Sequence, residues 1–474
     1  MQFKIALPKG HLLGETSSLL ARAGWGLDDY REGTRSYRLK SPDFPGLFAK
    51  VFQERDIPIQ VAVGNYDIGI CGLDWIEELL AKYPDSDLVK LRDLGYGTGS
   101  IYAAASTSVA VPRLETIKKQ TGIVRLAGEY PNLTESFALD LRLKRFSVFP
   151  LWGAVEAYPP ENADIVLVSR RGNDAALNHG LTAVSRVLGY SAYLIANKTA
   201  WESRDLSKAL DSIESVLTSG GAGKGGKSEN IIVEEPSREI FLPADRETIR
   251  LALADGHQQQ PTVELLTRAG IAVEDYPSKT GNRRPKSNLP GVSIKVVRPQ
   301  DMPLQVANGN FDLAITGIDW LTDHLNQFPS SPVEELVDLK FGWVRIVAVV
   351  SEEVPVSNTA ELRQYWAGRG TPVRVAAEYA NIADKYARDN HLGVYKVIPT
   401  WGATEAFLTE DADVLIENTQ TGRTLAQNRL KIIETLFEST ARLIVNKESL
   451  ADKRKNSKIK SIAETLRRAV GQQS

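Results

Sequence analysis

The stretch DIPIQVAVGNYDIGICGLDW (residues 56–75) occurs again as DMPLQVANGNFDLAITGIDW (301–320), at an offset of 245 positions. Working outward, FKIALPKGHLLGETSSLLARAG (3–24) aligns without a gap to IRLALADGHQQQPTVELLTRAG (249–270), at an offset of 246. Ordered matches of this length indicate an internal duplication. The repeat is far longer than a solenoid unit, so each copy is expected to be a whole folded unit.

Later matches keep nearly the same spacing. WGAVEAY (152–158) corresponds to WGATEAF (401–407), and LIANK (194–198) to LIVNK (443–447), both at an offset of 249. Because the offset drifts so little along the chain, positions of one copy can be compared with positions of the other. Residues that one copy kept and the other lost then indicate which positions serve binding or catalysis.

The repeat divides the chain into three parts. We predict a first unit over 1–217 (copy one), a linker with a connecting segment over 218–246, and a second unit over 247–474 (copy two). The linker begins with TSGGAGKGGKSEN (218–230), a Gly/Ser/Lys tract that cannot bury apolar surface and is typical of a flexible connection.

Composition excludes several classes of protein. The chain has 57 basic and 59 acidic residues, so its net charge of −2 gives no field that attracts nucleic acid or an anionic membrane. The single cysteine, Cys71, excludes an intrachain disulfide and a cysteine-rich metal site. The N-terminus lacks the apolar run of a signal peptide, and no stretch approaches 18 apolar residues. We therefore expect a soluble cytoplasmic protein.

Within each copy, short apolar runs alternate with helical patterns. FKIAL (3–7) and DIGIC (67–71) predict buried strands, and ETSSLLARAG (15–24) predicts a helix that ends at a glycine. This alternation indicates an α/β fold with largely parallel sheets. Such sheets bind ligands beyond the carboxyl ends of their strands.

The most informative loop lies in copy two, within ADVLIENTQTGRTLAQNRL (412–430). An apolar strand carrying Asp413 and Glu417 leads through 421–424 into a helix that starts near Leu425. Glycine lets the backbone approach a ligand, the threonine hydroxyls can donate, and the free N–H groups of a helix start attract anions. These features suit a phosphate, although the same letters also describe an ordinary capped strand–helix turn.

Taken together, the motifs resemble two fused short-form catalytic units of ATP phosphoribosyltransferase, the first enzyme of histidine biosynthesis. The resemblance covers most of both copies and includes ALPKGHL (6–12), RSYRL (35–39), EYPNLT (129–134), TGRTL (421–425) and ESTARLIVNK (438–447). It implies two lobes per unit joined by two crossovers, as in type II periplasmic binding proteins. The expected fold class is thus α/β, a tandem duplication of a two-lobed unit.

The resemblance also implies an activity. A glycosyltransferase of the pentosyltransferase class would condense ATP with 5-phosphoribosyl 1-pyrophosphate, giving N1-(5-phosphoribosyl)-ATP and pyrophosphate, with Mg²⁺ as cofactor and no metal ligand assigned to the protein. N1 of adenine is already nucleophilic, so no strong general base is needed. The alternative is a catalytically weakened nucleotide-binding or regulatory paralogue of that enzyme.

Site residues follow from the resemblance position by position. Residues implied to bind phosphoribosyl pyrophosphate are Asp413, Glu417, Thr421, Gly422, Arg423, Thr424 and Leu425. Residues implied to bind ATP are Lys9, Gly10, His11, Arg283 and Arg284, and the catalytic cations are Lys9 and Arg35. His11 departs from the family, which usually has arginine at that position.

The two copies are unequal at these positions. Gly422 and Thr424 fall on Asn173 and Ala175 of copy one, whereas Lys9 of copy one falls on Asp255 of copy two. One hypothesis treats copy one as a decaying scaffold. The other is complementation, in which copy two supplies the phosphoribosyl site and copy one adds positive charge across a pseudo-twofold interface.

The resemblance extends to partners. The lengths of the copies resemble the short form of the family, which implies a regulatory subunit similar to histidyl-tRNA synthetase. We expect a pseudo-dimer within one chain, open to higher homo-oligomers, that binds ATP and phosphoribosyl pyrophosphate but neither nucleic acid nor membrane. Activity in one copy or both, sharing of the site and histidine feedback are left open.

Overall fold

The computed structural model describes residues 3–33, 36–44, 46–108, 114–119, 121–172, 177, 180–218, 247–279, 281–402 and 404–471. Arg35, Asn173 and Ala175 lie outside these ranges, and so does the predicted linker apart from Thr218.

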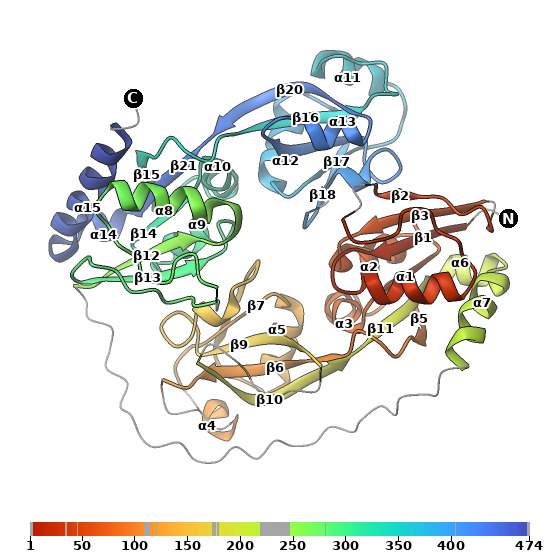
Figure 1. Cartoon of the computed structure of the whole chain (residues 1–474), viewed down its shortest axis with the longest axis horizontal. Helices are drawn as coiled ribbons and strands as arrows, with labels where there is room; N and C mark the ends of the chain where they lie inside the picture. Colours follow the sequence, from red (N-terminus) through yellow and green to blue (C-terminus); the bar gives the residue numbers. More distant parts are fainter. Residues whose placement is uncertain are drawn as a thin grey trace.

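Copy one consists of two lobes (Figure 1). Lobe 1A comprises residues 3–98 and 191–218, and lobe 1B comprises 99–190. The sheet of lobe 1A has the order β2 (Arg38–Leu39), β3 (Leu47–Phe52), β1 (Phe3–Pro8), β4 (Ile68–Gly72), β11 (Ala192–Asn197) and β5 (Leu88–Asp93). Its helices are α1 (Leu13–Arg22), α2 (Ile57–Ala62), α3 (Leu73–Lys82), α6 (Lys198–Ser203) and α7 (Ser207–Thr218), with the short 3-10 helix η1 (Glu54–Asp56).

Lobe 1B repeats the layered plan. Its sheet has the order β10 (Leu181–Tyr190), β6 (Gly99–Ser106), β9 (Ile165–Arg171), β7 (Val124–Gly128) and β8 (Phe146–Pro150). Its helices are α4 (Leu114–Lys118), α5 (Pro131–Asp140) and the 3-10 helix η2 (Val155–Ala157). The chain passes between the lobes twice, from β5 to β6 and from β10 to β11, which confirms the two predicted crossovers.

Copy two has the same plan. Lobe 2A (247–343 and 440–471) has the strand order β13 (Val292–Val297), β12 (Ile249–Ala254), β14 (Leu313–Gly317), β21 (Ala441–Asn446) and β15 (Val333–Asp338). Its helices are η3 (Gly256–Gln258), α8 (Gln259–Arg268), α9 (Met302–Ala307), α10 (Ile318–Gln327), α14 (Lys447–Ala451) and α15 (Lys453–Gly471). Lobe 2B (344–439) has the order β18 (Tyr395–Pro399), β17 (Val373–Ala377), β19 (Val414–Thr419), β16 (Val344–Ser351) and β20 (Leu430–Ser439). Its helices are α11 (Thr359–Trp366), α12 (Ala380–Asp389), α13 (Arg423–Gln427) and η4 (Thr404–Phe407).

The sheets are mixed, so the prediction of largely parallel sheets is only half right. β1 pairs in parallel with β3 and β4, but β11 runs antiparallel to both β4 and β5. The strand that returns from the other lobe enters the sheet in the opposite direction, and a sequence pattern does not show this. The central strands still read as predicted, because β4 is buried along its whole length, as expected for a strand covered on both faces.

Lobes of different copies pack against each other, 1A on 2B and 1B on 2A (Figure 1). In the first contact Phe52 meets Phe407 edge to face, with ring centroids 5.3 Å apart and both side chains almost fully buried. In the second, Tyr158 of lobe 1B shares a buried cluster with Met302 and Phe311 of lobe 2A. These interfaces are apolar cores, so the copies form a pseudo-dimer that is held together like a single folded unit.

A buried ion pair fixes the first interface. The Lys50 side chain is fully buried, and its ammonium donates to Glu410 at 2.8 Å and to Asp411 at 3.0 Å. The Tyr66 hydroxyl also donates to Asp411, at 3.0 Å. All three carboxylate contacts cross from lobe 1A to lobe 2B.

We predict that Lys50→Met lowers the free energy of unfolding by about 3–5 kcal/mol, because it leaves the buried Asp411 without its cation. Arg38→Ala is the control, since the half-exposed Arg38–Glu410 pair should contribute less than about 1 kcal/mol. Urea unfolding of both variants decides this. Equal losses would contradict the role assigned to Lys50.

Candidate functional site

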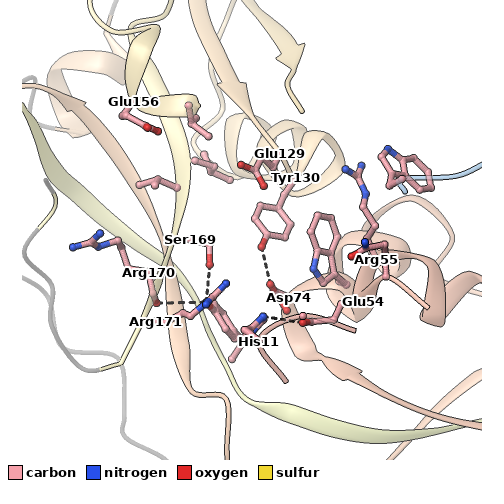
Figure 2. A pocket seen from close by; sticks show the side chains of 18 of the residues that line it. His11, Glu54, Arg55, Asp74, Glu129, Tyr130, Glu156, Ser169, Arg170 and Arg171 are labelled. Carbon is pink, nitrogen blue, oxygen red and sulfur yellow. Dashed lines mark hydrogen bonds and ion pairs between the residues drawn. The ribbon is translucent and has the colours of Figure 1, made fainter. Parts of the chain in front are cut away.

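Each copy has a cleft between its lobes, at the carboxyl ends of the parallel strands. The cleft of copy one holds a cavity of about 540 Å³ (Figure 2). Its lobe 1A wall includes Lys9, Gly10, His11, Glu54, Arg55 and Asp74, and its lobe 1B wall includes Glu129, Tyr130, Glu156, Ser169, Arg170 and Arg171. The predicted ATP-binding residues Lys9, Gly10 and His11 therefore lie together at this cavity.

Charged groups in the copy-one cleft are partly paired. His11 Nδ1 lies 2.8 Å from Glu54 Oε1, and the Tyr130 hydroxyl donates to Asp74 Oδ2 at 2.7 Å (Figure 2). Burial raises the pKa of Asp74 to about 6, against the hydrogen bond from Tyr130, which lowers it. A buried carboxyl that titrates near neutrality is a common feature of ligand sites.

Arg55 marks the place where the two copies meet. Its guanidinium stacks 4.1 Å from the ring centroid of Trp401 and 4.8 Å from that of Trp75. Burial lowers the pKa of Arg55 to about 10, although nearby carboxylates favour its charged form. Trp401 belongs to copy two, so the cavity of copy one is completed by a side chain from the other copy.

The TGRT loop follows β19 in lobe 2B and leads into α13. Gly422 has φ of +72°, a conformation that glycine adopts without strain, and its N–H donates to the Thr419 hydroxyl at 2.9 Å. A Cβ built on Gly422 would meet no atom within 4 Å, so the loop faces open space. Thr421, Arg423 and Thr424 are exposed there.

Three carboxyl groups stand beside the loop. Glu378 follows β17, Glu405 lies in η4 and Glu417 lies on β19. Burial raises the pKa of Glu417 well above its usual value, and the charges of Glu405 and Glu378 raise it further. Burial, then Glu405, raise the pKa of Glu378 to about 7. No ion pair to any of the three occurs among the described residues, and the raised pKa values mean that Glu378 and Glu417 hold protons near neutral pH until a cation or another ligand approaches.

Copy one reaches this cluster through Tyr37. Tyr37 packs against the interface cluster that contains Leu425 and lines one cavity with Glu405. Burial and then the charges of Glu405 and Glu417 raise the pKa of its phenol. The Lys9 ammonium donates to the Tyr37 hydroxyl at 3.2 Å and lies 4.9 Å from its ring centroid. Lys9 therefore contacts a side chain of lobe 1A that packs against lobe 2B.

The pseudo-symmetric position is filled differently. Arg283 occupies the position in copy two that Tyr37 occupies in copy one. The Arg283 carbonyl accepts from Val296 N–H, as the Tyr37 carbonyl accepts from the equivalent Val51 N–H. Arg283 bridges Glu156 at 2.6 Å and Asp255 at 2.8 Å. An internal ion pair thus occupies the place that Lys9 and Tyr37 hold on the other side, so the Arg283 guanidinium is not free to bind a phosphate.

Several predicted site residues have other roles in the structure. Asp413 lies just before β19 and forms a 2.8 Å ion pair with Arg374, as Asp164 does with Arg125 in copy one, so we correct its assignment to a structural one. Arg283 is held as described above, and Arg284 pairs with Glu161 at 2.8 Å, so neither presents a free charge to ATP. Leu425 is buried, and its side chain holds the loop against the core.

Sequence reasoning missed Tyr37, Glu378 and Glu405. Tyr37 lies inside the RSYRL motif, of which only Arg35 was assigned a role. The two glutamates occur in both copies at equivalent positions, which hid their value as markers. The available signal was the difference in charge at one aligned position, where copy one has the neutral hydroxyl of Tyr37 and copy two has the guanidinium of Arg283.

Metal-binding groups and membrane-spanning helices are both absent from the described residues. Within those ranges, no group of three or more His, Cys, Asp or Glu residues has the arrangement to hold a metal ion. None of the helices found there is long and apolar enough to cross a membrane.

Comparison with known proteins assigns the family. The model of the ATP phosphoribosyltransferase (HisG) family matches residues 53–218 and 298–468. The ATP phosphoribosyltransferase of Prosthecochloris aestuarii is 31% identical over 234 residues, which cover 48% of this chain and 74% of that protein. That of Methanopyrus kandleri is 36% identical over 196 residues, 41% of this chain and 63% of that protein. A solved ATP phosphoribosyl transferase (HisG:HisZ) complex from Thermotoga maritima aligns at a TM-score of 0.38 and 23% identity, over 48% of this chain and 100% of the matched chain. Because the family model matches both copies over most of their length, the chain belongs to the ATP phosphoribosyltransferase family.

Proposed function

We propose that the chain condenses ATP with 5-phosphoribosyl 1-pyrophosphate at one composite site, built from lobe 2B and lobe 1A. Family membership makes it a pentosyltransferase of histidine biosynthesis. The observation that carries the single shared site is the Lys9–Tyr37 pair of copy one, because Tyr37 packs against the cluster that contains Leu425 of the intact loop and lines one cavity with Glu405 of copy two.

The TGRT loop would hold the 5′-phosphate of the donor. Its exposed residues 421–424 surround open space, and Gly422 lets a phosphate approach the backbone without meeting a side chain. Leu425 fixes the loop to the core, so its N–H groups are already in place before binding.

Mg²⁺ would bind at this site only together with the substrate, because the described residues contain no group of three acidic, His or Cys side chains arranged to hold a metal ion. Burial and then the charge of Glu405 raise the pKa of Glu378 and of Glu417, and none of the three carboxyls has an ion pair among the described residues, so a nearby cation would lower these two pKa values and favour the charged carboxylates. Glu417 would accept from the ribose hydroxyls, and Glu405 would hold waters of the metal ion. Bound Mg²⁺ would supply positive charge to the pyrophosphate oxygens, mostly through the substrate and water rather than through protein ligands.

Lys9 and Tyr37 would stabilise the departing pyrophosphate. The ammonium and the phenol both donate hydrogen bonds to anionic oxygens, and Lys9 is held in place by its contact with Tyr37. The protein's task is then alignment of two substrates and stabilisation of charge, since N1 of adenine attacks without a general base. Gly10 and His11 are retained as proposed ATP contacts on the same lobe.

The competing function is a regulatory paralogue that binds nucleotide without turnover. Two observations favour this paralogue, the lost loop of copy one and the Asp255–Arg283 ion pair of copy two. Each of them affects only one of the two clefts. The test is to mix the purified chain with ATP, phosphoribosyl pyrophosphate and Mg²⁺ and to follow adenine absorbance. Formation of N1-(5-phosphoribosyl)-ATP supports the enzyme, and its absence with intact donor binding supports the paralogue.

Partners and location are proposed on the same basis. The solved Thermotoga maritima assembly is a HisG:HisZ complex. We extend this to a regulatory subunit resembling histidyl-tRNA synthetase for the present chain, and to the cytoplasm as its location. Co-purification with such a subunit, and a change in activity on adding it, would support the pairing.

The raised pKa of Glu378 predicts a pH effect on stability. Its folded-state pKa of about 7 exceeds the usual 4.5, so its contribution is complete below pH 4.5 and is lost as the pH rises through 7. Glu378→Gln removes that loss, so the variant should gain stability relative to the parent between pH 5 and 8, by at least ~1 kcal/mol at pH 8. Urea midpoints across this range check it. A constant difference would contradict the assignment.

A further inference from the structure

A second cavity lies at the contact between lobe 1B and lobe 2A. It has a volume of about 720 Å³, within the usual range for small-molecule sites, and shares no lining residue with the cavity of copy one. One side consists of residues 284–287 and of β13, the edge strand of the lobe 2A sheet (Figure 1). Lobe 1B contributes Glu161 and Asn162, and the start of α15 contributes Arg454 and Lys455.

The cavity is at the amino ends of the lobe 2A strands. Its lining includes Thr248 and Arg250 at the start of β12, Val292 and Ser293 at the start of β13, and Phe311 just before β14. The two clefts lie at the opposite, carboxyl ends of the parallel strands. This cavity is therefore separate from the sites proposed above for ATP and the phosphoribosyl donor.

Copy one fills the equivalent space with an aromatic ring. β1 and β3 pair Lys4 with Phe48, and β12 and β13 pair Arg250 with Ser293 in the same register, so Phe48 and Ser293 lie at equivalent positions on the same face of their sheets. The Phe48 ring packs on Tyr66, with ring centroids 6.4 Å apart. Ser293 is exposed and has no ring, so copy two keeps open a space that copy one closes.

The ion pairs of the two interfaces also differ. At the interface of lobes 1A and 2B, Lys50 contacts two carboxylates, one of which is Asp411. At the interface of lobes 1B and 2A, the equivalent Lys295 contacts one carboxylate, Glu161, at 2.9 Å, and the amide oxygen of Asn162 at 2.6 Å. Asn162 aligns with Asp411 at the offset of 249, so the second interface has lost a negative charge.

Four cations around the cavity share two carboxylates. The cations that line it are Arg250, Arg284, Lys295 and Lys455. Glu161 accepts from Arg284 and Lys295, at 2.8 and 2.9 Å, and Asp312 accepts from Arg250 and Lys455, at 3.0 and 2.8 Å. Two positive charges are thus in excess within this group. Burial and then the charge of Arg284 lower the pKa of Lys295 to about 8, against the attraction of Glu161, and a bound anion would favour the charged ammonium.

Apolar side chains complete the lining. Phe311 is buried where copy one has Tyr66, and Pro285, Val292 and Ile294 lie around the charged groups. A bare inorganic anion would leave these side chains without contact. The lining therefore suits a ligand that joins an anionic group to an organic body.

We propose that the cavity between lobes 1B and 2A binds a small phosphate monoester, with its phosphate on the four cations and its organic part against the apolar side chains. A phosphate monoester carries about two negative charges near neutral pH, which matches the excess of two positive charges. Guanidinium groups bind phosphate through paired N–H groups, and ammonium groups act as point charges. The inference is independent of the proposed function, because the cavity lies at the opposite end of the strands from both clefts.

The test is calorimetric titration of phenyl phosphate into the full chain and into its Ser293→Phe variant, which introduces the ring that copy one has at Phe48. Both proteins carry Gly422→Asp and Thr424→Ala, so that the donor loop does not bind the probe. The chain with Ser293 should bind one phenyl phosphate, and Ser293→Phe should bind it at least about tenfold more weakly, because the ring occupies the cavity. Ser330→Phe, the same substitution in an exposed turn of lobe 2A, is the control and should leave binding unchanged.

Asn162→Asp tests the charge separately from the shape. It restores the carboxylate that the other interface has at Asp411 and removes one of the two excess positive charges, so phenyl phosphate should bind at least about tenfold more weakly. Inorganic phosphate should bind the chain with Asn162 at least about tenfold more weakly than phenyl phosphate, since it cannot bury apolar surface against Phe311.

Three results would overturn the inference, provided that thermal melts show folded proteins. They are no binding of phenyl phosphate to the chain with Ser293, equal binding to Ser293→Phe, and tighter binding of succinate than of phenyl phosphate, which would assign the cavity to dicarboxylates. If Ser293→Phe does not fold, Asn162→Asp decides in its place. Failure of the proposed function is a different result, because the parent chain would then form no product from ATP and phosphoribosyl pyrophosphate whether or not it binds phenyl phosphate.

Discussion

The double variant Gly422→Asp, Thr424→Ala should lose phosphoribosyl pyrophosphate binding by at least about a thousandfold. The aspartate places a negative charge where a phosphate must sit, and two like charges at contact distance in a partly desolvated loop repel by several kcal/mol. Thr424 is exposed in the open loop, so its removal takes away a hydroxyl donor without disturbing the core. Titration of the donor into the variant by calorimetry measures the loss.

Asn173→Asp is the matched control, because residue 173 aligns with Gly422 although it lies outside the described residues. It should change donor affinity by less than about twofold. If the copy-two variant bound the donor normally and the control did not, the phosphoribosyl site would belong to copy one. That outcome would also remove the ground for a single composite site.

The sequence predicted much of this loop and little of its surroundings. The TGRT motif, the preceding strand and the helix after it all occur where the pattern placed them, because they depend on neighbours within a few residues. Glu417 was singled out because it lies on the same strand. Asp413 directly precedes that strand, yet its pairing with Arg374 depends on a contact 39 residues away, which no local pattern shows.

Contacts between the copies could not be predicted from the sequence. The Phe52–Phe407 contact and the Lys50–Asp411 pair join positions more than 350 residues apart, and single-copy motifs say nothing about which lobes meet. The loss of Lys9 from copy two did suggest complementation. The structure packs lobe 1A against lobe 2B and places Tyr37, which bonds Lys9, against the cluster that contains Leu425, and this packing supports the proposal that a cation of copy one serves the loop of copy two.

Lys9→Ala should lower kcat/KM by about a hundredfold, the usual effect of removing one charge-stabilising donor from an active site. Tyr37→Phe should lower it by about tenfold, since it removes the hydroxyl that bonds Lys9 but keeps the ring. Both losses should fall mainly on kcat, because the proposed contacts strengthen as pyrophosphate departs. Steady-state kinetics with each substrate varied in turn separates kcat from KM.

Asp255→Ala is the control for these variants, because Asp255 occupies the Lys9 position in copy two and is held by Arg283. We expect it to change kcat/KM by less than about threefold. The full chain is the right material, since copy two alone would expose Phe407 and the apolar face that packs on lobe 1A. Full activity of both Lys9→Ala and Tyr37→Phe would reduce copy one to a scaffold. A loss in Lys9→Ala alone would keep the shared site but assign the contact to the ammonium without the phenol.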